Sequence, residues 1–187
     1  MTDDIIKACE LLERGKIILY PTDTVWGIGC DATDSYAVKR IYEIKPRSDS
    51  KALIVLSDSI DNIADYLTPL SKETELLLND SSRPTTVVTK AYIGLAPELL
   101  AEDGTVGVRI THEEFSSQLC RHFGRPIVST SANVSGYPTP ATFDEISDVI
   151  KDTVDYICTS RRDETEARQP SRVIKVEDNG NITILRP

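Results

Sequence analysis

The sequence has little of what most metal and catalytic sites are made from. It contains only two histidines, His112 and His122, among 187 residues. With so few histidines, neither a zinc site nor a Ser-His-Asp triad is supported. The four cysteines stand far apart, with no metal-ligand or redox spacing: Cys9, Cys30, Cys120 and Cys158. We therefore expect buried free thiols, as in a reducing compartment.

Long apolar runs and common nucleotide fingerprints are also missing. No segment approaches 18 consecutive apolar residues, so we expect no membrane span. The first ten residues, MTDDIIKACE, lack the charge pattern and apolar run of a signal peptide, and we expect a cytoplasmic protein. Neither Gly-x-x-x-x-Gly-Lys-[Ser/Thr] nor Gly-x-Gly-x-x-Gly occurs, which excludes a P-loop and a dinucleotide fingerprint.

The excess of acidic residues argues against a protein that holds nucleic acid through its overall field. The formal net charge is −9 and the pI is about 4.8. Dedicated nucleic-acid binders are usually basic. The balance therefore favours a small-molecule enzyme, with any anion site confined to a local basic patch.

Strand and helix patterns alternate along most of the chain and predict a single α/β domain over residues 1–187, with a largely parallel sheet. A hairpin at the C-terminus, turning at Asn179-Gly180, makes that sheet mixed. Apparent capping boxes at Thr111/Glu114 and Thr142/Glu145 predict helix starts. The expected helices are 2–14, 33–44, 59–66, 69–79, 111–123 and 142–151. The expected strands are 17–19, 52–56, 85–89, 105–110, 126–128, 156–158, 173–176 and 182–185.

The region that the rest of the chain seems built around is 16–55, predicted as strand, Thr-rich loop, helix, basic loop and strand. Gly27 and Gly29 would allow a sharp turn or the close approach of a ligand. Lys45, Arg47 and Lys51 lie within seven positions and could bind a polyphosphate. A solvated basic loop explains them equally well, and the residues alone leave both interpretations open.

A second polar stretch, 129–136, follows an apolar strand with a cluster of hydroxyls and one amide. Ligands of open α/β sheets bind beyond the carboxyl ends of strands. The stretch would suit a ribose, a phosphate or a polar amino acid, although the spacing alone slightly favours a Ser/Asn turn with local side-chain to backbone hydrogen bonds. Arg109 and Arg186 could each bind a carboxylate or phosphate, or be surface arginines.

Four motifs occur together and in order: Pro21-Thr22-Asp23-Thr24-Val25-Trp26-Gly27, Lys45-x-Arg47…Lys51, Gly107-Val108-Arg109, and Ser131-Ala132-Asn133-x-Ser135-Gly136. The ordered set resembles the YrdC family of threonylcarbamoyl-AMP synthases over nearly the whole chain. The resemblance implies a twisted open sheet of mixed parallel and antiparallel strands, with flanking helices and a concave, locally positive cavity.

The resemblance also implies an activity. Members are nucleotidyltransferases that make L-threonylcarbamoyladenylate and pyrophosphate from L-threonine, bicarbonate or CO2, and ATP. Mg2+ is expected on the ATP phosphates rather than at a protein metal site. The product feeds modification of the adenosine next to the anticodon of tRNA, so the implied partners are downstream transfer proteins and possibly tRNA itself.

Roles carry over by position. A catalytic, phosphate-binding cluster is implied for Lys45, Arg47 and Lys51. Further ATP contacts are implied for Thr105, Ser131, Asn133, Thr139 and Arg186. Threonine contacts are implied for Thr24, Arg109, Ser129 and Ser171.

The sequence departs from the family pattern at Pro46, Leu56, Thr111 and Arg172. It lacks the C-terminal domain of the larger family form, which implies a short single-domain version. The charged segment 160–170 is a candidate mobile lid. Two alternatives stay open: an RNA-binding or chaperone-like member of the same fold without synthase activity, and an unrelated ATP-dependent carbamoylating or adenylating enzyme.

Overall fold

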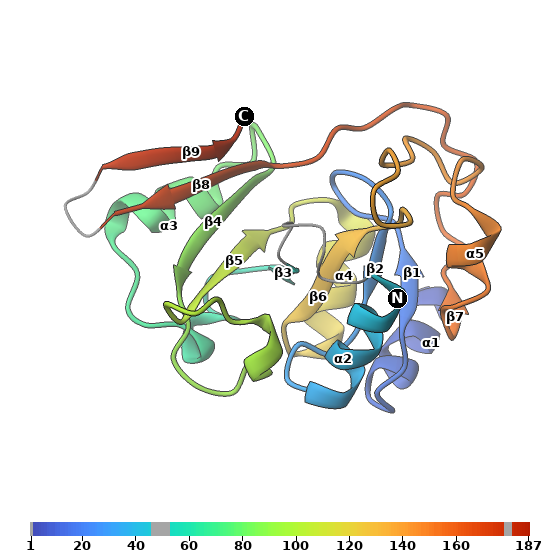
Figure 1. Ribbon diagram of the computed structural model, residues 1–187, viewed down its shortest axis with the longest axis horizontal. Helices are drawn as coiled ribbons and strands as arrows, with labels where there is room; N and C mark the ends of the chain where they lie inside the picture. The colour runs from blue at the N-terminus through green and yellow to red at the C-terminus, as the bar shows by residue number, and fades with distance from the viewer. Residues whose placement is uncertain (1, 46–52, 178–180) are drawn as a thin grey trace.

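A computed structural model describes residues 2–45, 53–177 and 181–187. The strands form one nine-stranded open sheet in the order β7-β1-β2-β6-β3-β5-β4-β8-β9 (Figure 1). Their bounds are β1 Ile18–Tyr20, β2 Gly27–Gly29, β3 Ile54–Ser57, β4 Thr85–Lys90, β5 Thr105–Ile110, β6 Ile127–Ser131, β7 Tyr156–Ile157, β8 Arg172–Val176 and β9 Ile182–Arg186.

The sheet is mixed, as predicted. The pairs β1–β7, β3–β5 and β4–β8 are parallel. The other neighbouring pairs are antiparallel. The expectation that parallel pairs would dominate is therefore wrong. One reason is that the short loop 21–26 joins β1 directly to β2, and such a connection can only return the chain antiparallel.

Helices cover both faces of this sheet. Their bounds are α1 Asp3–Leu12, α2 Ser35–Ile44, α3 Lys72–Asn79, α4 Glu114–Phe123 and α5 Asp148–Lys151, with 3-10 turns η1 Ala64–Tyr66 and η2 Pro97–Leu99. Asp34 caps α2 by accepting from two backbone amides, and Ser71 caps α3. Gly124 ends α4 in the left-handed conformation, with φ 71°, which glycine adopts without strain.

Several predicted boundaries are wrong. Glu113, not Thr111, caps α4, since its carboxylate accepts from the amides of the first turn. Glu145 accepts from the amide of Ala141 instead of capping a helix, and α5 begins later, capped by Ser147. The predicted helix 59–66 is reduced to η1 and turns.

Two apolar clusters pack on opposite faces of the sheet. The larger contains residues of α2 and α3 together with Leu19, Val55 and Val108 of the strands. The smaller lies beneath α1 and α4 and includes the fully buried Tyr20 and Leu56. Since side chains alternate between the faces of a strand, β1, β3 and β6 each contribute to both clusters.

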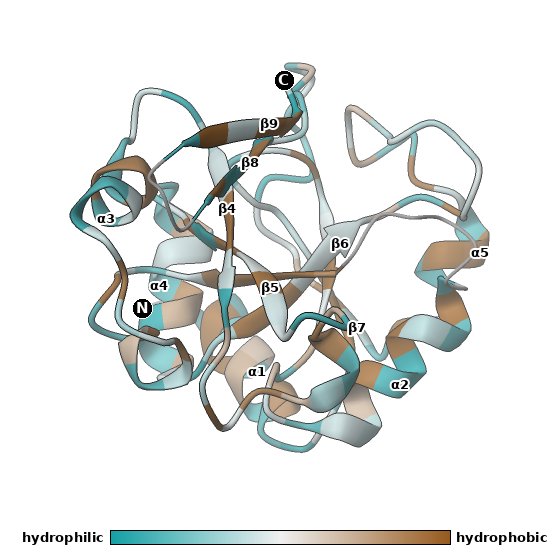
Figure 2. Cartoon of the chain, turned by 60° about the vertical axis from the view of Figure 1, so that its left-hand side comes forward, coloured by the Kyte–Doolittle hydropathy of each residue, from teal (hydrophilic) through white to brown (hydrophobic). Residues whose placement is uncertain are grey.

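The hydrophobic edge strand β9 lies outside both clusters (Figure 2). Its Ile182, Ile184 and Leu185 are exposed. Within the described ranges, no helix is both long enough and apolar enough to cross a membrane.

Candidate active site

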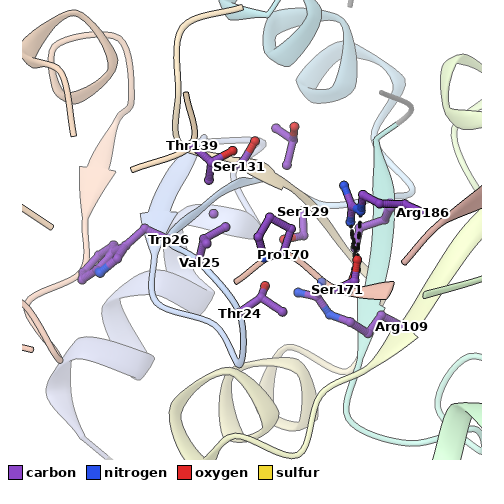
Figure 3. A pocket seen from close by; sticks show the side chains of 13 residues that line it. Thr24, Val25, Trp26, Arg109, Ser129, Ser131, Thr139, Pro170, Ser171 and Arg186 are labelled. Carbon is purple, nitrogen blue, oxygen red and sulfur yellow. Dashed lines mark hydrogen bonds between the residues drawn. The ribbon is translucent and has the colours of Figure 1, made fainter. Parts of the chain in front are cut away.

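One face of the sheet opens into a cavity of about 560 Å3, counting the space open to solvent. This is the face that α1 and α4 cover elsewhere. Figure 3 shows the side chains that converge there from several strands and loops. The described lining residues are Thr24, Val25, Trp26, Gly27, Ile54, Arg109, Ser129, Thr130, Ser131, Thr139, Pro170, Ser171 and Arg186.

Strands β2 and β6 form the floor, where Gly27 pairs with Ser131. The sequence prediction of a turn at Gly27 and Gly29 is wrong, because both lie in β2. The prediction of close approach fits Gly27, since a Cβ there would lie 3.0 Å from the Ser129 hydroxyl. A Cβ at Gly29 would meet the Val128 carbonyl at 2.5 Å. Glycine is therefore required for packing at one position and leaves the cavity floor open at the other.

The Thr-rich loop 21–26 forms one wall. Thr22 shapes it by donating its hydroxyl to the Val25 carbonyl at 2.7 Å and accepting from the Thr24 amide at 3.1 Å. Thr24 thereby lines the cavity with its side chain almost fully buried. Trp26 packs its ring against Phe143, with centroids 4.9 Å apart, so it serves as wall and core rather than as a base-stacking platform.

Two arginines approach each other across the opposite side of the cavity. Arg109 projects from β5, and Arg186 ends β9 (Figure 3). Burial lowers the pKa of Arg186, and the nearby charge of Arg109 lowers it further. Arg186 donates two hydrogen bonds to the Ser171 carbonyl, at 2.9 and 2.7 Å. Because like charges repel at short range, the two guanidinium groups favour an anion here, and the Asp23 carboxylate lies 3.0 Å from Nη2 of Arg109.

Ser171 is held in the same corner. Its hydroxyl lies 2.8 Å from that of Thr86 and within 3.2 Å of an Arg186 nitrogen. The neighbouring departure Arg172 points a nitrogen at Thr85, 3.0 Å away. The arginine at 172 therefore leaves Ser171 in the lining.

Lys45 ends α2 and reaches the end of β6. Its Nζ lies 2.7 Å from the Ser131 carbonyl and 2.9 Å from the Asn133 side-chain oxygen. Ser131 also donates to that oxygen at 2.5 Å. The structure therefore brings together one lysine, one hydroxyl and one amide that come from two separate sequence motifs. The predicted partners Arg47 and Lys51, and the departure Pro46, lie outside the described residues.

Not every predicted site residue faces this cavity. Thr105 begins β5, four residues before Arg109, and its hydroxyl donates to Asp103 at 2.6 Å. At about 3.3 Å per strand residue, the two lie roughly 13 Å apart. Asn133 is not among the described lining residues and reaches the site through Lys45 and Ser131. Leu56 lies in the core beneath α4 rather than in the lining.

Sequence reasoning missed other lining residues, namely Val25, Ile54, Thr130 and Pro170. Val25 belongs to the Thr-rich motif and Thr130 to the polar stretch 129–136, but neither pattern shows which of its side chains face a cavity. Ile54 could be found by alternation, since Leu53 and Val55 belong to the opposite core.

The charged segment 160–170 contacts both the Thr-rich loop and the start of α4. Arg161 donates to the Thr22 carbonyl at 3.1 Å and pairs with Glu113 at 2.9 Å. Four residues of the segment line a smaller hollow behind the Thr-rich loop: Arg161, Glu164, Glu166 and Arg168. The segment thus supports the wall that carries Thr24, and its role as a moving lid stays a prediction.

Comparisons with known proteins agree with this geometry. Residues 10–187 match the Sua5/YciO/YrdC family model, described as telomere recombination. A threonylcarbamoyl-AMP synthase of Acinetobacter baumannii is 32% identical, over 93% of this chain and 94% of that protein. The Escherichia coli protein of the same name is 34% identical, over 77% of each chain.

Solved structures give the same result. P. abyssi Sua5 complexed with L-threonine superposes with a TM-score of 0.85 at 27% identity, and this chain spans 55% of its length. E. coli YciO gives a TM-score of 0.83 at 26% identity, over 97% of this chain and 87% of that one. The relatives support the synthase over the RNA-binding alternative, and the chain belongs to the Sua5/YciO/YrdC family.

Proposed function

We propose that this protein joins L-threonine, bicarbonate or CO2, and ATP into threonylcarbamoyl-AMP, with release of pyrophosphate. The observation that carries the proposal is that two arginines, Arg109 and Arg186, lie near each other on one side of the cavity. The floor of the same cavity holds Ser129 and Ser131. Two cations suit a substrate carboxylate and a phosphate group, and the hydroxyls suit polar substrate groups.

The chemistry fits a site without a nucleophilic side chain. The threonine ammonium releases a proton to solvent, the resulting amine attacks the carbon of CO2, and a second proton leaves the nitrogen for solvent as the carbamate forms. A carbamate oxygen then attacks the α-phosphorus of ATP, and the bond from that phosphorus to the bridging oxygen breaks as pyrophosphate leaves. Both steps depend on alignment and charge neutralisation, which fixed arginines and hydroxyls provide.

In this proposal Arg109 binds the threonine carboxylate, with Thr24, Ser129 and Ser171 beside it. Arg186 and Lys45 face the ATP phosphates. The remaining ATP contacts are proposed for Arg47, Lys51, Thr105, Ser131, Asn133 and Thr139. The position of Thr105 at the far end of β5 makes its contact the one that most needs testing.

Mg2+ is proposed to enter with the nucleotide. The described lining offers arginines and hydroxyls but no carboxylate, and among the described residues no three metal-ligating side chains gather to hold a cation. This donor set does not fit a protein-held magnesium site. The phosphates and water would supply the ligands of the ion, and its charge would help pyrophosphate leave.

Pyrophosphate release tests the proposal directly. Purified protein would be incubated with ATP, Mg2+ and bicarbonate, with and without L-threonine. We expect release that requires both threonine and bicarbonate and falls at least about 100-fold in Lys45→Met, because a charge-stabilising donor would be lost. Release that ignores threonine would indicate another acceptor, and no release from folded protein with salt-dependent RNA binding would favour the binding alternative.

Delivery of the product defines the proposed partners. A mixed carbamic-phosphoric anhydride is labile, so proteins that transfer threonylcarbamoyl to tRNA would have to take it up promptly. We also propose a cytoplasmic location, because the proteins that would take up this product modify tRNA there.

A further inference from the structure

A carboxylate outside the predicted set stands beside the arginine proposed to bind the substrate carboxylate. Asp23 lies in the loop 21–26, immediately before Thr24. Its Oδ1 is 3.0 Å from Nη2 of Arg109, and the two side chains are only 11% and 4% exposed. The neighbouring residue Thr24 and Arg109 itself both line the cavity. The pair therefore sits at the cavity wall.

Hydrogen bonding at this pair is incomplete. Within the described residues, neither Oδ1 of Asp23 nor Nε of Arg109 makes a hydrogen bond, although both atoms are buried. The close contact is thus an ion pair without favourable hydrogen-bond geometry. Leaving buried polar atoms without hydrogen-bond partners destabilises a structure. A ligand that completed both groups would remove this destabilisation.

The surrounding groups do not supply the missing partners. Burial raises the pKa of Tyr20, whose hydroxyl approaches Ser129 and the Val128 carbonyl, so this phenol stays neutral. The described cavity lining contains no aspartate or glutamate. An amino acid brings one ammonium group, and Asp23 is the carboxylate that contacts the lining residue Arg109.

Opposite charges side by side match an amino acid better than a simple acid. A zwitterion carries a carboxylate and an ammonium on the same carbon. Arg109 can take the first and Asp23 the second, which leaves each buried charge neutralised. A substrate with only a carboxylate would instead compete with Asp23 for Arg109 and leave Asp23 unpaired.

We propose that Asp23 binds the ammonium group of the amino-acid substrate and holds Arg109 in its place when the cavity is empty. This inference rests on the proposed function and names the residue that selects an amino acid over the corresponding hydroxy acid. The carboxylate orients the amine and does not need to accept its proton.

Binding calorimetry with two ligands tests the inference. One ligand is L-threonine; the other is the 2,3-dihydroxybutanoate of matching configuration, which has a hydroxyl in place of the ammonium. We expect wild type to prefer threonine, and Asp23→Asn to weaken threonine at least about 10-fold, the loss of one charge-assisted contact. The hydroxy acid should bind Asp23→Asn as well as wild type or more tightly, because its competitor for Arg109 is gone.

A matched control distinguishes a substrate contact from general damage. Asp31 is another buried aspartate paired with an arginine, with Oδ2 2.9 Å from Nε of Arg125, and it does not line the cavity. Asp31→Asn should leave the affinities for both ligands unchanged. If Asp23→Asn fails to fold, Asp23→Glu retains the charge and should keep the preference for threonine while shifting both affinities by less than Asn does.

Two results would overturn the inference. Equal weakening of both ligands in Asp23→Asn would reduce Asp23 to a support for Arg109, and no change would remove it from the site. Failure of the proposed function is recognised separately, because wild type would then release no threonine-dependent pyrophosphate whatever Asp23→Asn does. Threonine-dependent release by wild type together with an unaltered ligand preference in Asp23→Asn would retain the function and reject the inference alone.

Discussion

One face of the sheet has two regions. In one region, the closed end, α1 and α4 cover the strands. In the other, the open end, the strands line the cavity. On β6, Ile127 and Ser129 project to the same side, two residues apart. Ile127 packs in the core beneath α1 and α4, whereas Ser129 lines the cavity. On β3, Leu56 and Ile54 repeat the contrast.

The difference lies in what covers the strand rather than in the strand itself. Where α1 and α4 cover the sheet, large apolar side chains fill the space. Beyond the helices, Gly27, Ser129 and Ser131 take the equivalent positions of β2 and β6. Tyr20, fully buried, stands at the boundary, and its hydroxyl lies 3.3 Å from the Val128 carbonyl. We expect mutations at the closed end to change stability and mutations at the open end to change activity.

The largest effect is expected at the closed end, from Leu119→Ala. Leu119 is fully buried in the cluster beneath α4. Truncating a buried leucine costs about 2–5 kcal/mol through lost apolar contact and a remaining cavity. Urea denaturation should show this loss, while pyrophosphate release per folded molecule should stay near that of wild type. A change in the threonine KM with unchanged stability would contradict the expectation that mutations at the closed end affect stability rather than activity.

A smaller loss of stability is expected from Asp4→Asn, which lies on α1 at the closed end. The carboxylate accepts from the Tyr156 hydroxyl, from the amides of Thr159 and Ser160 and from the Ser160 hydroxyl, at 2.7–3.0 Å. An asparagine cannot accept all of these, so we expect a loss of about 2–3 kcal/mol.

The effect of Asp4→Asn should depend on pH. Burial alone would raise the pKa of Asp4, but the hydrogen bonds from Ser160, Thr159 and Tyr156 outweigh it and hold the pKa below its ordinary value. The ionised form therefore stabilises the fold above the unfolded-state pKa of about 3.9, and this advantage is lost as pH falls through the lower, folded-state pKa. Urea titrations at pH 7 and pH 3 should show the gap between wild type and variant narrowing. A gap that stays constant would mean that Asp4 acts through shape rather than charge.

The local signals that could be read from the sequence were those carried by single residues. Asp34, Ser71 and Gly124 mark helix ends correctly because the capping interaction involves only neighbouring residues. Strand β2 was missed because Gly27 and Gly29 have low β-propensity. Their extended conformation is set by pairing with β1 and β6, which no local pattern reveals.

The sequence predicted those site residues that lie in a motif at or near the end of a strand. Arg109 and Ser171 come together because β5 and β8 both pair with β4, and Ser131 lines the same cavity from the end of β6. Thr105 and Arg109 lie four residues apart and therefore project from the same face of β5. Only Arg109 lines the cavity, and residue spacing alone does not predict which of the two does so. Leu76 belongs to the apolar run 76–78 and is nevertheless 64% exposed, because consecutive residues pass around α3 rather than along one side of it.

At the open end, Arg186→Gln should weaken ATP without unfolding the protein. The loss of one charged contact to phosphate corresponds to about 10-fold in affinity. The guanidinium also packs against Ser171, so thermal melting serves as the control. The KM for ATP should rise more than the KM for threonine. An equal rise in both would show that Arg186 supports the whole corner rather than the nucleotide.

The smallest effect, and the sharpest test of the comparison, is Gly27→Ala. The added Cβ would lie 3.0 Å from the Ser129 hydroxyl and 3.4 Å from the Thr22 methyl. The backbone of β2 accepts alanine, so overpacking should cost about 1 kcal/mol or less in stability while the threonine KM rises about 5- to 10-fold. The double variant Gly27→Ala/Ser129→Ala removes the atom nearest the new methyl group and should recover part of the loss relative to Ser129→Ala alone. If the two substitutions are instead additive, the methyl group acts on the strand and not on the cavity, and the floor is less closely fitted than the contact indicates.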